Sequence, residues 1–496
     1  MLLATAFVLP ASAEDLLPHR NDLTPADRAR VASIVSTPRD FSKPETFEFM
    51  SGGAATTRKR INRDIFSHSS ANITFEEEQT FKVGNGLFKK LWASSPSSTQ
   101  ASDGLGPLYN ARSCQACHLK DGRGRPPLPG HDAVSLFLRL SVPPQNAEQE
   151  ELLSSRALLS IPEPTYGGQF QTFAVPGVAG EGRFDIELED IPVKLSGGES
   201  ATLQKPTYVI RDLGYGDMHS DALISPRVAP PMIGMGLLEA IHPGDIEAQA
   251  DPDDINGDGI SGKISKVRDP LTGELTIGRF GWKASNPSVR AQTAGAFSGD
   301  IGIGSPDKPA PWGDCTETQA DCRKMPNGEQ ARLGPTEAPD PVMELVTFYS
   351  ENLAVPARRD MSAPQVLKGK EVFHEAGCAN CHRPKYVTSR NAQNAAHRFQ
   401  LIWPYTDLLL HDMGDGLSDG RPVGDANGKE WRTPPLWGIG LTETVNKHTR
   451  FLHDGRARNL LEAVLWHGGE AKQSRDHVVE LPTEDRAALI RFLETL

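Results

Sequence analysis

Cys114-Gln-Ala-Cys-His118 and Cys378-Ala-Asn-Cys-His382 are two copies of the pattern C-x-x-C-H. This is the attachment pattern of c-type haem, because two thiols one helical turn apart form thioethers to both vinyl groups of one porphyrin. The adjacent histidine then lies under the iron as its proximal ligand. The two copies use four of the six cysteines. The sequence therefore predicts two covalently bound haem c groups, one held by Cys114, Cys117 and His118 and the other by Cys378, Cys381 and His382.

Two other interpretations of the C-x-x-C pairs are weaker. A thioredoxin-like redox pair is expected in a βαβ setting, and neither flank shows that pattern. A zinc ribbon places its two pairs within about 15–20 residues of each other. Here about 260 residues separate the pairs, and each pair has its own histidine. Haem attachment is the interpretation that uses every residue of the pattern.

Length and composition indicate a globular protein of several domains. The chain has 496 residues, which favours about three domains. Its 46 glycines and 39 prolines indicate a loop-rich architecture. The formal net charge of −12 argues against nucleic acid as a partner, because phosphate binding needs a basic face. No apolar run is long enough to cross a bilayer, so we expect no membrane span.

The first residues, MLLATAFVLPASAED, have features of a secretion signal. Leu2–Pro10 is a short apolar run and Ala11-Ser-Ala13 matches an A-x-A cleavage site, although no basic residue precedes the run. We expect residues 1–13 to be a signal peptide and the protein to be periplasmic; a disordered or buried segment is the alternative. Cys315 and Cys322 would pair as a disulfide in that oxidising compartment, with free thiols or a redox-active pair as the alternative.

Apolar periodicity and polar capping residues predict a limited set of elements. Helices are expected at Pro25–Ser36, Phe75–Trp92, Ser362–Ala376 and Thr483–Leu496, with Ser362 and Thr483 as N-caps. Strands are expected within His131–Pro144, Gln169–Val175 and Tyr208–Leu213. A helix leading into C-x-x-C-H and a closing amphipathic helix are the plan of a class I cytochrome c domain. We therefore expect a mainly α fold with irregular loops and some β-hairpins, made of two cytochrome c-like haem domains: a heavily elaborated one over residues 14–340 and a smaller one over 350–496.

Long stretches of the chain resemble a known family. They are Phe81–Trp92, Gly104–Gly124, Pro230–Ile241, Gly278–Ile303 and Arg432–Glu470. They are similar to the di-haem c-type oxidoreductases, often labelled "thiol oxidoreductase", within the bacterial di-haem cytochrome c peroxidase superfamily. The resemblance implies that one haem transfers electrons, that the other meets peroxide or another oxidant, and that an aromatic residue carries electrons between them. The N-terminal haem is usually the reactive one.

The resemblance also suggests the second ligand of the C-terminal haem. In the peroxidases an F-x-H-D-G motif precedes a helix whose methionine binds the iron. Here Phe451-Leu-His-Asp-Gly455 matches the motif, and His467 stands where the methionine would be. A related maturation enzyme has tyrosine there. We infer ligation by His382 and His467, which should lower the potential because methionine ligation raises it. A histidine on the helix surface is the alternative.

Other roles follow from the same resemblance. Trp282 is the candidate electron relay, and Lys283 or Gln292 would face the pocket of the reactive haem; a buried structural tryptophan is the alternative. Arg432 would pair with a propionate of the second haem, unless it lies on the surface. The distal ligand of the first haem stays open between His131, Met232, Met235 and no ligand. Core packing is favoured for the two methionines, and a solvated position is favoured for His131.

Asp254-Ile-Asn-Gly-Asp-Gly-Ile-Ser261 has the D-x-N-x-D-G pattern of a calcium loop. Oxygen atoms of Asp254, Asn256 and Asp258 at alternate positions would converge on one ion. The glutamate that ends an EF-hand loop is missing, because Ser265 occupies that position. The sequence therefore favours a stabilising Ca²⁺ site, with a turn rich in Asx residues as the alternative.

These observations lead to one functional expectation and two rivals. We expect a periplasmic di-haem c oxidoreductase in which a small redox-donor protein reduces the C-terminal haem. Electrons would then reach the N-terminal haem, which reduces peroxide or oxidises a substrate. The rivals are a non-catalytic di-haem electron carrier and an enzyme that oxidatively modifies a partner protein. Thiol exchange is disfavoured, because both C-x-x-C pairs are assigned to haem.

Overall fold

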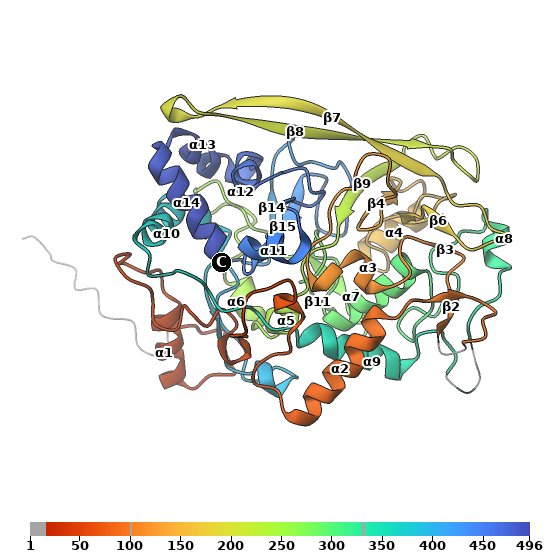
Figure 1. The fold of residues 1–496 in the computed structure, drawn as a ribbon, viewed down its shortest axis with the longest axis horizontal. Coiled ribbons are helices and arrows are strands. Elements are labelled where there is room, and N and C mark those ends of the chain that lie inside the picture. Colours follow the sequence, from red (N-terminus) through yellow and green to blue (C-terminus); the bar gives the residue numbers. More distant parts are fainter. Residues whose placement is uncertain (1–15, 100–101, 330–331, 333) are drawn as a thin grey trace, which may run out of the picture.

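The computed structural model describes residues 16–99, 102–329, 332 and 334–496. About 31% of it is helical and 17% is strand, and the described strands form small sheets of two or three strands each. The expectation of a mainly α fold is therefore wrong. Helices, short sheets and long irregular segments are mixed along the chain (Figure 1), because frequent glycine and proline end regular elements after a few residues. The expected signal peptide lies outside the described residues.

Helices occur along the whole described chain, and those longer than five residues form the scaffold around both C-x-x-C-H motifs. The α-helices are α1 (Pro25–Val35), α2 (Phe75–Lys89), α3 (Cys114–Cys117), α4 (Ala147–Ser154), α5 (Met235–Glu239), α6 (Pro243–Glu247), α7 (Val289–Ala296), α8 (Ala320–Arg323), α9 (Asp340–Glu351), α10 (Pro364–Glu375), α11 (Thr442–Asn446), α12 (Leu460–Leu465), α13 (Lys472–Glu480) and α14 (Thr483–Thr495).

Strands are short except for one pair. They are β1 (Ala93–Ser94), β2 (Asp103–Leu105), β3 (Leu108–Tyr109), β4 (Leu136–Ser141), β5 (Gln169–Phe170), β6 (Phe173–Ala174), β7 (Arg183–Lys194), β8 (Ser200–Arg211), β9 (Leu223–Val228), β10 (Lys266–Arg268), β11 (Leu275–Ile277), β12 (Tyr386–Val387), β13 (Leu401–Ile402), β14 (Leu410–Asp412) and β15 (Glu430–Arg432). The three expected strand regions contain β4, β5 with β6, and the end of β8. The sheet with the order β5-β4-β9 is antiparallel.

β7 and β8, of twelve residues each, form an antiparallel hairpin that extends along one side of the molecule, over the C-terminal helices (Figure 1). Its outward side chains are mostly charged, and its inner apolar side chains pack on the C-terminal core. At the turn, Arg486 of α14 donates to the Ser196 carbonyl at 2.8 Å and to Glu199 at 2.7 Å. The hairpin therefore ties the middle of the chain to its C-terminal end.

The helix expected at Phe75–Trp92 forms as α2 and ends at Lys89. Thr74 caps α2 in a capping box with Glu77, and three glutamates fill the first turn, where the helix dipole favours them. α2 packs against α9, and Gly84 permits the close approach, because a Cβ there would lie 2.2 Å from the Leu345 carbonyl oxygen. This pair of helices supports the start of α3.

The second motif follows α10. Gly377 takes a positive φ of 77°, which ends α10 so that Cys378 begins the next turn. α10 crosses α14 at Gly369, where an added Cβ would lie 2.0 Å from the Ala488 carbonyl oxygen. The two expected caps are wrong: Ala363 and Pro482 occupy the N-cap positions, and neither makes a side-chain cap hydrogen bond. Proline at the start of α10, with its fixed φ, takes the place of a polar cap.

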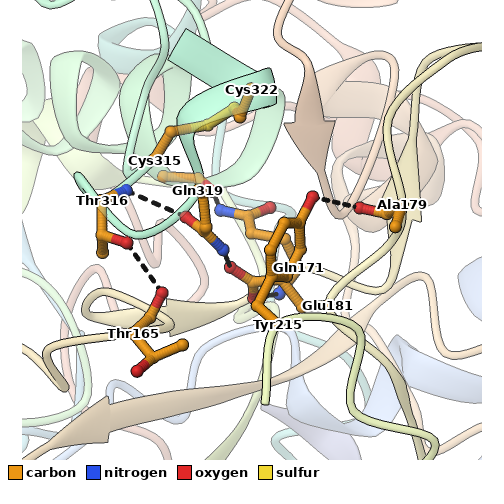
Figure 2. The surroundings of a disulfide bond; sticks show 10 residues. Thr165, Gln171, Ala179, Glu181, Tyr215, Cys315, Thr316, Gln319 and Cys322 are labelled. Carbon is orange, nitrogen blue, oxygen red and sulfur yellow. Dashed lines mark hydrogen bonds between the residues drawn. A yellow bond between two sulfur atoms is a disulfide. The ribbon is translucent and has the colours of Figure 1, made fainter.

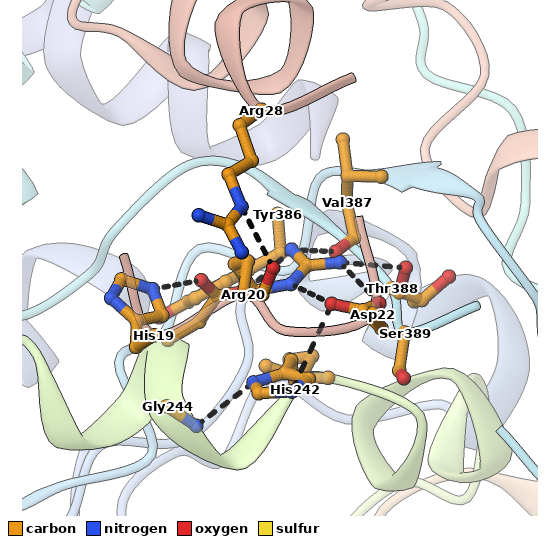
Figure 3. A network of polar contacts seen from close by, with 12 residues as sticks. His19, Arg20, Asp22, Arg28, His242, Gly244, Tyr386, Val387, Thr388 and Ser389 are labelled. Carbon is orange, nitrogen blue, oxygen red and sulfur yellow. Dashed lines mark hydrogen bonds and ion pairs between the residues drawn. The ribbon is translucent and has the colours of Figure 1, made fainter. Parts of the chain in front are cut away.

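The two main hydrophobic clusters both cross the expected domain boundary near residues 340–350. One joins Phe88 to Tyr386, and the other joins Leu138 to Phe492. The N-terminal segment is fixed to the C-terminal half by the buried Arg20, which donates to the Val387 carbonyl at 3.0 Å and pairs with Asp22 and Asp245 (Figure 3). The division into two haem domains stays a prediction. No helix among the described residues is long and apolar enough to cross a membrane.

Candidate functional site

Both C-x-x-C-H motifs line one cavity of about 870 Å³. Its walls include all four motif cysteines with His118 and His382, and its lining is largely apolar. The volume is within the range of roughly 300–1,000 Å³ that is usual for pockets of small ligands and cofactors. Residues far apart in the sequence thus meet around one space, as two adjacent haem groups would require.

Three histidines that line the cavity share one hydrogen-bonding arrangement. In each, Nδ1 lies within hydrogen-bond distance of a backbone carbonyl oxygen, which can only accept, so Nδ1 carries the proton and Nε2 is left as a metal ligand. The pairs are His118 with Pro230 at 2.8 Å, His382 with Tyr405 at 3.0 Å and His467 with Ala463 at 2.7 Å. Burial lowers the pKa of His118 and His382 to about 4 and also lowers that of His467, so all three are neutral.

His382 and His467 face each other across the cavity. Their ring centroids are 6.5 Å apart. Two imidazoles that bind one metal ion from opposite sides have centroids roughly 6 Å apart, because each metal–nitrogen bond is about 2 Å long. The two rings are therefore spaced as a pair of axial ligands, as the bis-histidine hypothesis requires.

The motif cysteines are not reactive thiols. Burial raises the pKa of Cys114 and Cys378 to about 12, raises that of Cys381, and raises that of Cys117 well above its ordinary value. Reactive cysteines have lowered pKa values and electropositive, partly exposed surroundings. The pairs instead line an apolar wall of the cavity, where thioether attachment of a porphyrin needs them.

Buried arginines give the cavity the means to hold carboxylates. Arg123, Arg227 and Arg432 line it, and burial lowers the pKa of each to about 10. Arg432 donates to the carbonyls of Gly281 and Thr433, and its Nη2 makes no hydrogen bond with the described residues. Arginine binds carboxylates strongly through charge-assisted hydrogen bonds.

Three buried nitrogen atoms of residues that line the cavity also have no hydrogen-bond partner among the described residues: Arg421 Nε, His453 Nε2 and Trp437 Nε1. Buried polar atoms of this kind are normally hydrogen-bonded. An apolar cavity with two C-x-x-C-H motifs, axial imidazoles and unpaired donors fits haem groups with their propionates.

An aromatic group adjoins the cavity. Trp282 lines it and donates through Nε1 to the Val228 carbonyl at 2.8 Å. His453 of the F-x-H-D-G motif stacks on Trp431, with ring centroids 3.8 Å apart and planes at 14°. The centroid of the same histidine is 6.5 Å from that of Trp282. Reasoning from sequence singled out Trp282 but gave no role to His453 or Trp431, although the motif and the neighbouring Arg432 were signals.

Lys283 does not line the cavity. Its Nζ is buried and donates to Asp419 at 2.8 Å and to the carbonyls of Arg421 and Asn427 at 2.7 and 2.8 Å. Its side chain therefore ends in a buried polar cluster beside Trp431, whose ring centroid lies 4.7 Å from Nζ. Gln292 does line the cavity, and its Oε1 accepts from Asn286 at 2.9 Å.

The candidates for the distal ligand of the first haem differ in whether they line the cavity. His131 is exposed and is not part of the cavity wall, whereas Met232 and Met235 line it and belong to the hydrophobic core. Among the described residues that line the cavity, His118 has no partner imidazole comparable to the pair of His382 and His467. In the part of the chain that it describes, the structure therefore places a second imidazole close to His382 and no comparable one close to His118.

Asp300 is a site residue that reasoning from sequence missed. It lines the cavity from a π-helical turn, Phe297–Ile301, a distortion that is frequent at functional sites. Gln169 Nε2 donates to it at 2.9 Å, and burial raises its pKa although Arg139 opposes that shift. Asp300 also lies near the first motif, since its charge raises the pKa of Cys114 and Cys117. No sequence pattern marks a π-helical turn.

His411 lies beside the second motif. Its Nε2 is 2.8 Å from Asp407, its Nδ1 is 2.7 Å from Glu470, and its Nδ1 is 3.8 Å from Cys381 Sγ. Burial alone would lower the pKa of His411, but Asp407 and its other acidic neighbours raise it well above the ordinary value. Both ring nitrogens of His411 are thus engaged by carboxylates, which leaves neither of them free as an axial ligand.

The proposed calcium loop is exposed and close to the second motif in space. Within it, Asp254 accepts from Gly259 N, Asn256 from Asp258 N, and Asp258 from Ile260 N. At its end, Ser261 Oγ donates to Glu470 at 2.6 Å. These bonds form Asx turns and leave the choice between an ion site and a plain turn open.

Cys315 and Cys322 form a disulfide with Cα atoms 6.3 Å apart (Figure 2). The loop that it closes presents Gln319, whose Nε2 donates to Glu181 at 2.5 Å. Burial raises the pKa of Glu181 well above its ordinary value. Asp314, next to the disulfide, accepts from Gly168 N and Gln169 N at 2.6 and 2.9 Å. The disulfide therefore supports the wall that carries Gln169.

Comparison with known proteins gives a family. The family described as "Di-haem oxidoreductase, putative peroxidase" matches residues 47–496. No curated protein sequence matches the chain. A solved structure of hydrazine synthase from Kuenenia stuttgartiensis, pressurised with xenon, is similar at 15% identity over 45% of this chain and 74% of that one, with a TM-score of 0.23, which is too low to support an argument. The family match spans most of the chain, so this protein belongs to the di-haem oxidoreductases, enzymes of peroxidase-like type that use haem.

Proposed function

We propose that this protein is an exported di-haem c enzyme. A small donor protein would reduce the C-terminal haem, and the N-terminal haem pocket would reduce peroxide or a related small oxidant. One observation carries the proposal: a shared cavity offers two facing imidazoles at the second motif and one at the first. A site with two strong axial ligands suits electron transfer, whereas a site with one leaves room for a substrate.

Covalent attachment is supported by the motif spacing and by the position of the thiols. In each motif the two cysteines and the following histidine line the same cavity, so one porphyrin could meet all three. The disulfide and the expected export agree with this, because disulfides persist in oxidising compartments. Mass spectrometry of the denatured mature protein should find two haem groups still bound. Release of either haem on denaturation would refute covalent attachment at that motif.

The haem groups supply the redox chemistry, and the chain supplies ligands, charge and protons. Reduction of one peroxide to two waters consumes two electrons and two protons. Asp300 is placed to hold one of these protons, because burial raises its pKa and its carboxylate faces the cavity. Gln169 fixes one of its oxygens, and Gln292 Nε2 is a further donor on the wall. Arg432 and Arg123 would neutralise propionates.

Trp282 is the proposed route between the two haem sites. It lies in the cavity wall and its ring is close to His453, which stacks on Trp431. Substitution Trp282→Phe should keep both haem groups and slow electron transfer between them, measured by rapid mixing of the reduced enzyme with peroxide. An unchanged rate would remove Trp282 from the route.

Spectroscopy tests the division of labour. Electron paramagnetic resonance of the oxidised protein should show one low-spin bis-histidine haem and one haem that binds cyanide or peroxide. His467→Gly should change the low-spin signal of the C-terminal haem and leave the signal of the N-terminal haem unchanged. If neither haem binds cyanide in any oxidation state, the protein is an electron carrier and the enzymatic proposal fails.

A calcium ion at Asp254, Asn256 and Asp258 is the remaining part of the proposal. Alternate oxygen side chains and the link from Ser261 through Glu470 to His411 support it, because an ion there would stabilise a segment in contact with the second haem site. Elemental analysis after dialysis should find calcium bound to the wild-type protein, and the Asp258→Ala variant should contain none. Equal calcium content in the two proteins would favour a plain turn.

A further inference from the structure

The first C-x-x-C-H motif lies within an unusually basic part of an acidic protein. Residues 58–64, 82–92 and 110–120 contain nine lysines and arginines and one acidic residue, a net charge of +8. The whole chain carries −12, so the rest of the molecule carries −20. The basic residues are Arg58, Lys59, Arg60, Arg63, Lys82, Lys89, Lys90, Arg112 and Lys120.

These three segments meet in space. Lys120, two residues after His118, forms an ion pair with Asp64 at 2.5 Å. α2 contacts α3, and the turn Ile65–Ser67 contacts the turn Leu119–Asp121. Trp92 N donates to the Arg112 carbonyl at 2.9 Å, and Arg112 Nε donates back to the Trp92 carbonyl at 3.0 Å. The segments therefore form one surface around the first motif, which we call the basic face; α2 and α3 lie next to each other in Figure 1.

The basic face also exposes apolar side chains. Leu91 is 62% exposed and Val83 is 54% exposed, and Ile61 and Leu119 are also exposed. Ala116, between the two cysteines of the motif, is exposed as well. Most of the surrounding cations are exposed. Exposed apolar residues beside the motif with cations around them are the arrangement of a transient protein interface, in which a polar rim surrounds an apolar centre.

We propose that the basic face docks an acidic partner protein, which thereby lies against the attached edge of the N-terminal haem. The charge contrast selects the partner, because most cations of this face are exposed and, among the described residues, only Lys82 and Lys120 pair with a carboxylate, those of Glu78 and Asp64, whereas the rest of the molecule is strongly acidic. A protein with an acidic face is therefore attracted and oriented here. A docking site at the first motif goes beyond the proposed function, in which the donor protein meets the C-terminal haem. It gives the N-terminal haem its own protein partner.

A nucleic acid or another polyanion is a different occupant. The apolar side chains favour a protein, since phosphate backbones are held by cations and hydrogen-bond donors. The position favours a redox protein, because the face surrounds the residues that hold the haem. Such encounters are weak and use small areas, below about 1,200 Å² in total.

The test uses the intact di-haem protein and an acidic flavodoxin as the probe. Binding is measured by calorimetry or surface plasmon resonance at low and high ionic strength, and haem reduction by the reduced probe is followed in rapid mixing. The test variant is Lys59→Glu/Lys89→Glu, because both lysines are exposed and form no ion pair among the described residues. The matched control is Lys194→Glu/Lys205→Glu on the β7–β8 hairpin, with the same change of charge.

We expect the wild type and the control to bind the probe alike and to lose binding as salt is added. The test variant should bind at least tenfold more weakly at low salt and should keep little salt dependence, since steering by charge changes association rates by roughly 10–1,000-fold. Equal effects of the two variants would overturn the proposal, as would tighter binding of a single-stranded oligonucleotide than of flavodoxin at equal charge. Cyanide binding and the haem spectra should be unchanged in both variants, so this result is independent of the peroxide chemistry.

Discussion

Substitution of Lys283 by methionine separates a structural role from a catalytic one. Sequence alone placed Lys283 near the pocket of the reactive haem, whereas the structure gives its Nζ three hydrogen bonds to Asp419 and to the carbonyls of Arg421 and Asn427. Asp419, its ionic partner, is also buried, with Arg227 at 3.4 Å and Ser225 at 2.5 Å. Methionine keeps the length of the side chain and removes the charge. The expected effect is on stability.

The magnitude follows from the burial of the pair. Removing one partner of a buried ion pair costs about 3–5 kcal/mol, because the remaining charge is left uncompensated. Arg227 and Ser225 still bind Asp419, so we expect about 3 kcal/mol. The entropy of unfolding of a chain of 496 residues is roughly 1 kcal/mol per kelvin if it unfolds in one step. Lys283→Met should therefore lower the melting temperature by about 3 °C.

Differential scanning calorimetry of the holoprotein gives the melting temperature, and cyanide binding and peroxide turnover are measured below it. Lys283→Met/Asp419→Leu is the control, because removing both partners should restore much of the lost stability. Haem spectra and turnover should stay close to wild type in both. A variant that melts like the wild type but loses most of its peroxide turnover would show that Lys283 acts in the pocket and would refute this reasoning.

Three further predictions concern stability. Gly369→Val should destabilise the C-terminal haem region by 3 kcal/mol or more, because a Cβ would overlap the Ala488 carbonyl; thermal unfolding followed in the haem absorbance of the second site measures this. Burial and the neighbouring Glu239 raise the pKa of Glu351 to about 8. Ionisation of Glu351 therefore lowers the stability of the folded state as the pH rises from about 4.5 to 8. Glu351→Gln should raise the melting temperature at pH 8.5 but not at pH 4. Cys315→Ser opens the small disulfide loop and should lower the free energy of unfolding, measured by chemical denaturation, by about 2 kcal/mol. As a control, reduction of the disulfide in the wild type should lower it equally.

Local signals in the sequence located the elements that hold the haem groups. The pattern C-x-x-C-H can be recognised without knowledge of the surrounding residues. α2 has a capping box and acidic residues in its first turn, so residues close together in the sequence determine where such a helix begins. His467 was found through its place after the F-x-H-D-G motif, and it lies 6.5 Å from His382 between ring centroids. Short-range patterns therefore predicted helix α2 and picked out two histidines that lie close together, and their roles as haem ligands stay predictions.

Contacts between distant segments could not be predicted in the same way. Lys283 follows Trp282 directly, yet the two side chains point to different places because Asp419 and the carbonyls of Arg421 and Asn427 hold the lysine. Asp300 reaches the cavity through a π-helical turn that no residue pattern marks. Such positions depend on partners more than a hundred residues away, and a periodicity within one segment contains no information about them.

The error in fold class has a physical cause that also bears on function. A mainly α fold was expected because a helix leading into C-x-x-C-H and a closing amphipathic helix are the plan of a class I cytochrome c domain. Instead, the two hydrophobic clusters draw on both halves of the chain, and both motifs open into one cavity of about 870 Å³. The walls of this cavity are built from helices of both halves of the chain, together with strands, loops and the π-helical turn. Two porphyrins in this cavity would complete the core and join the two halves, and electron transfer between neighbouring redox centres would then follow from the fold.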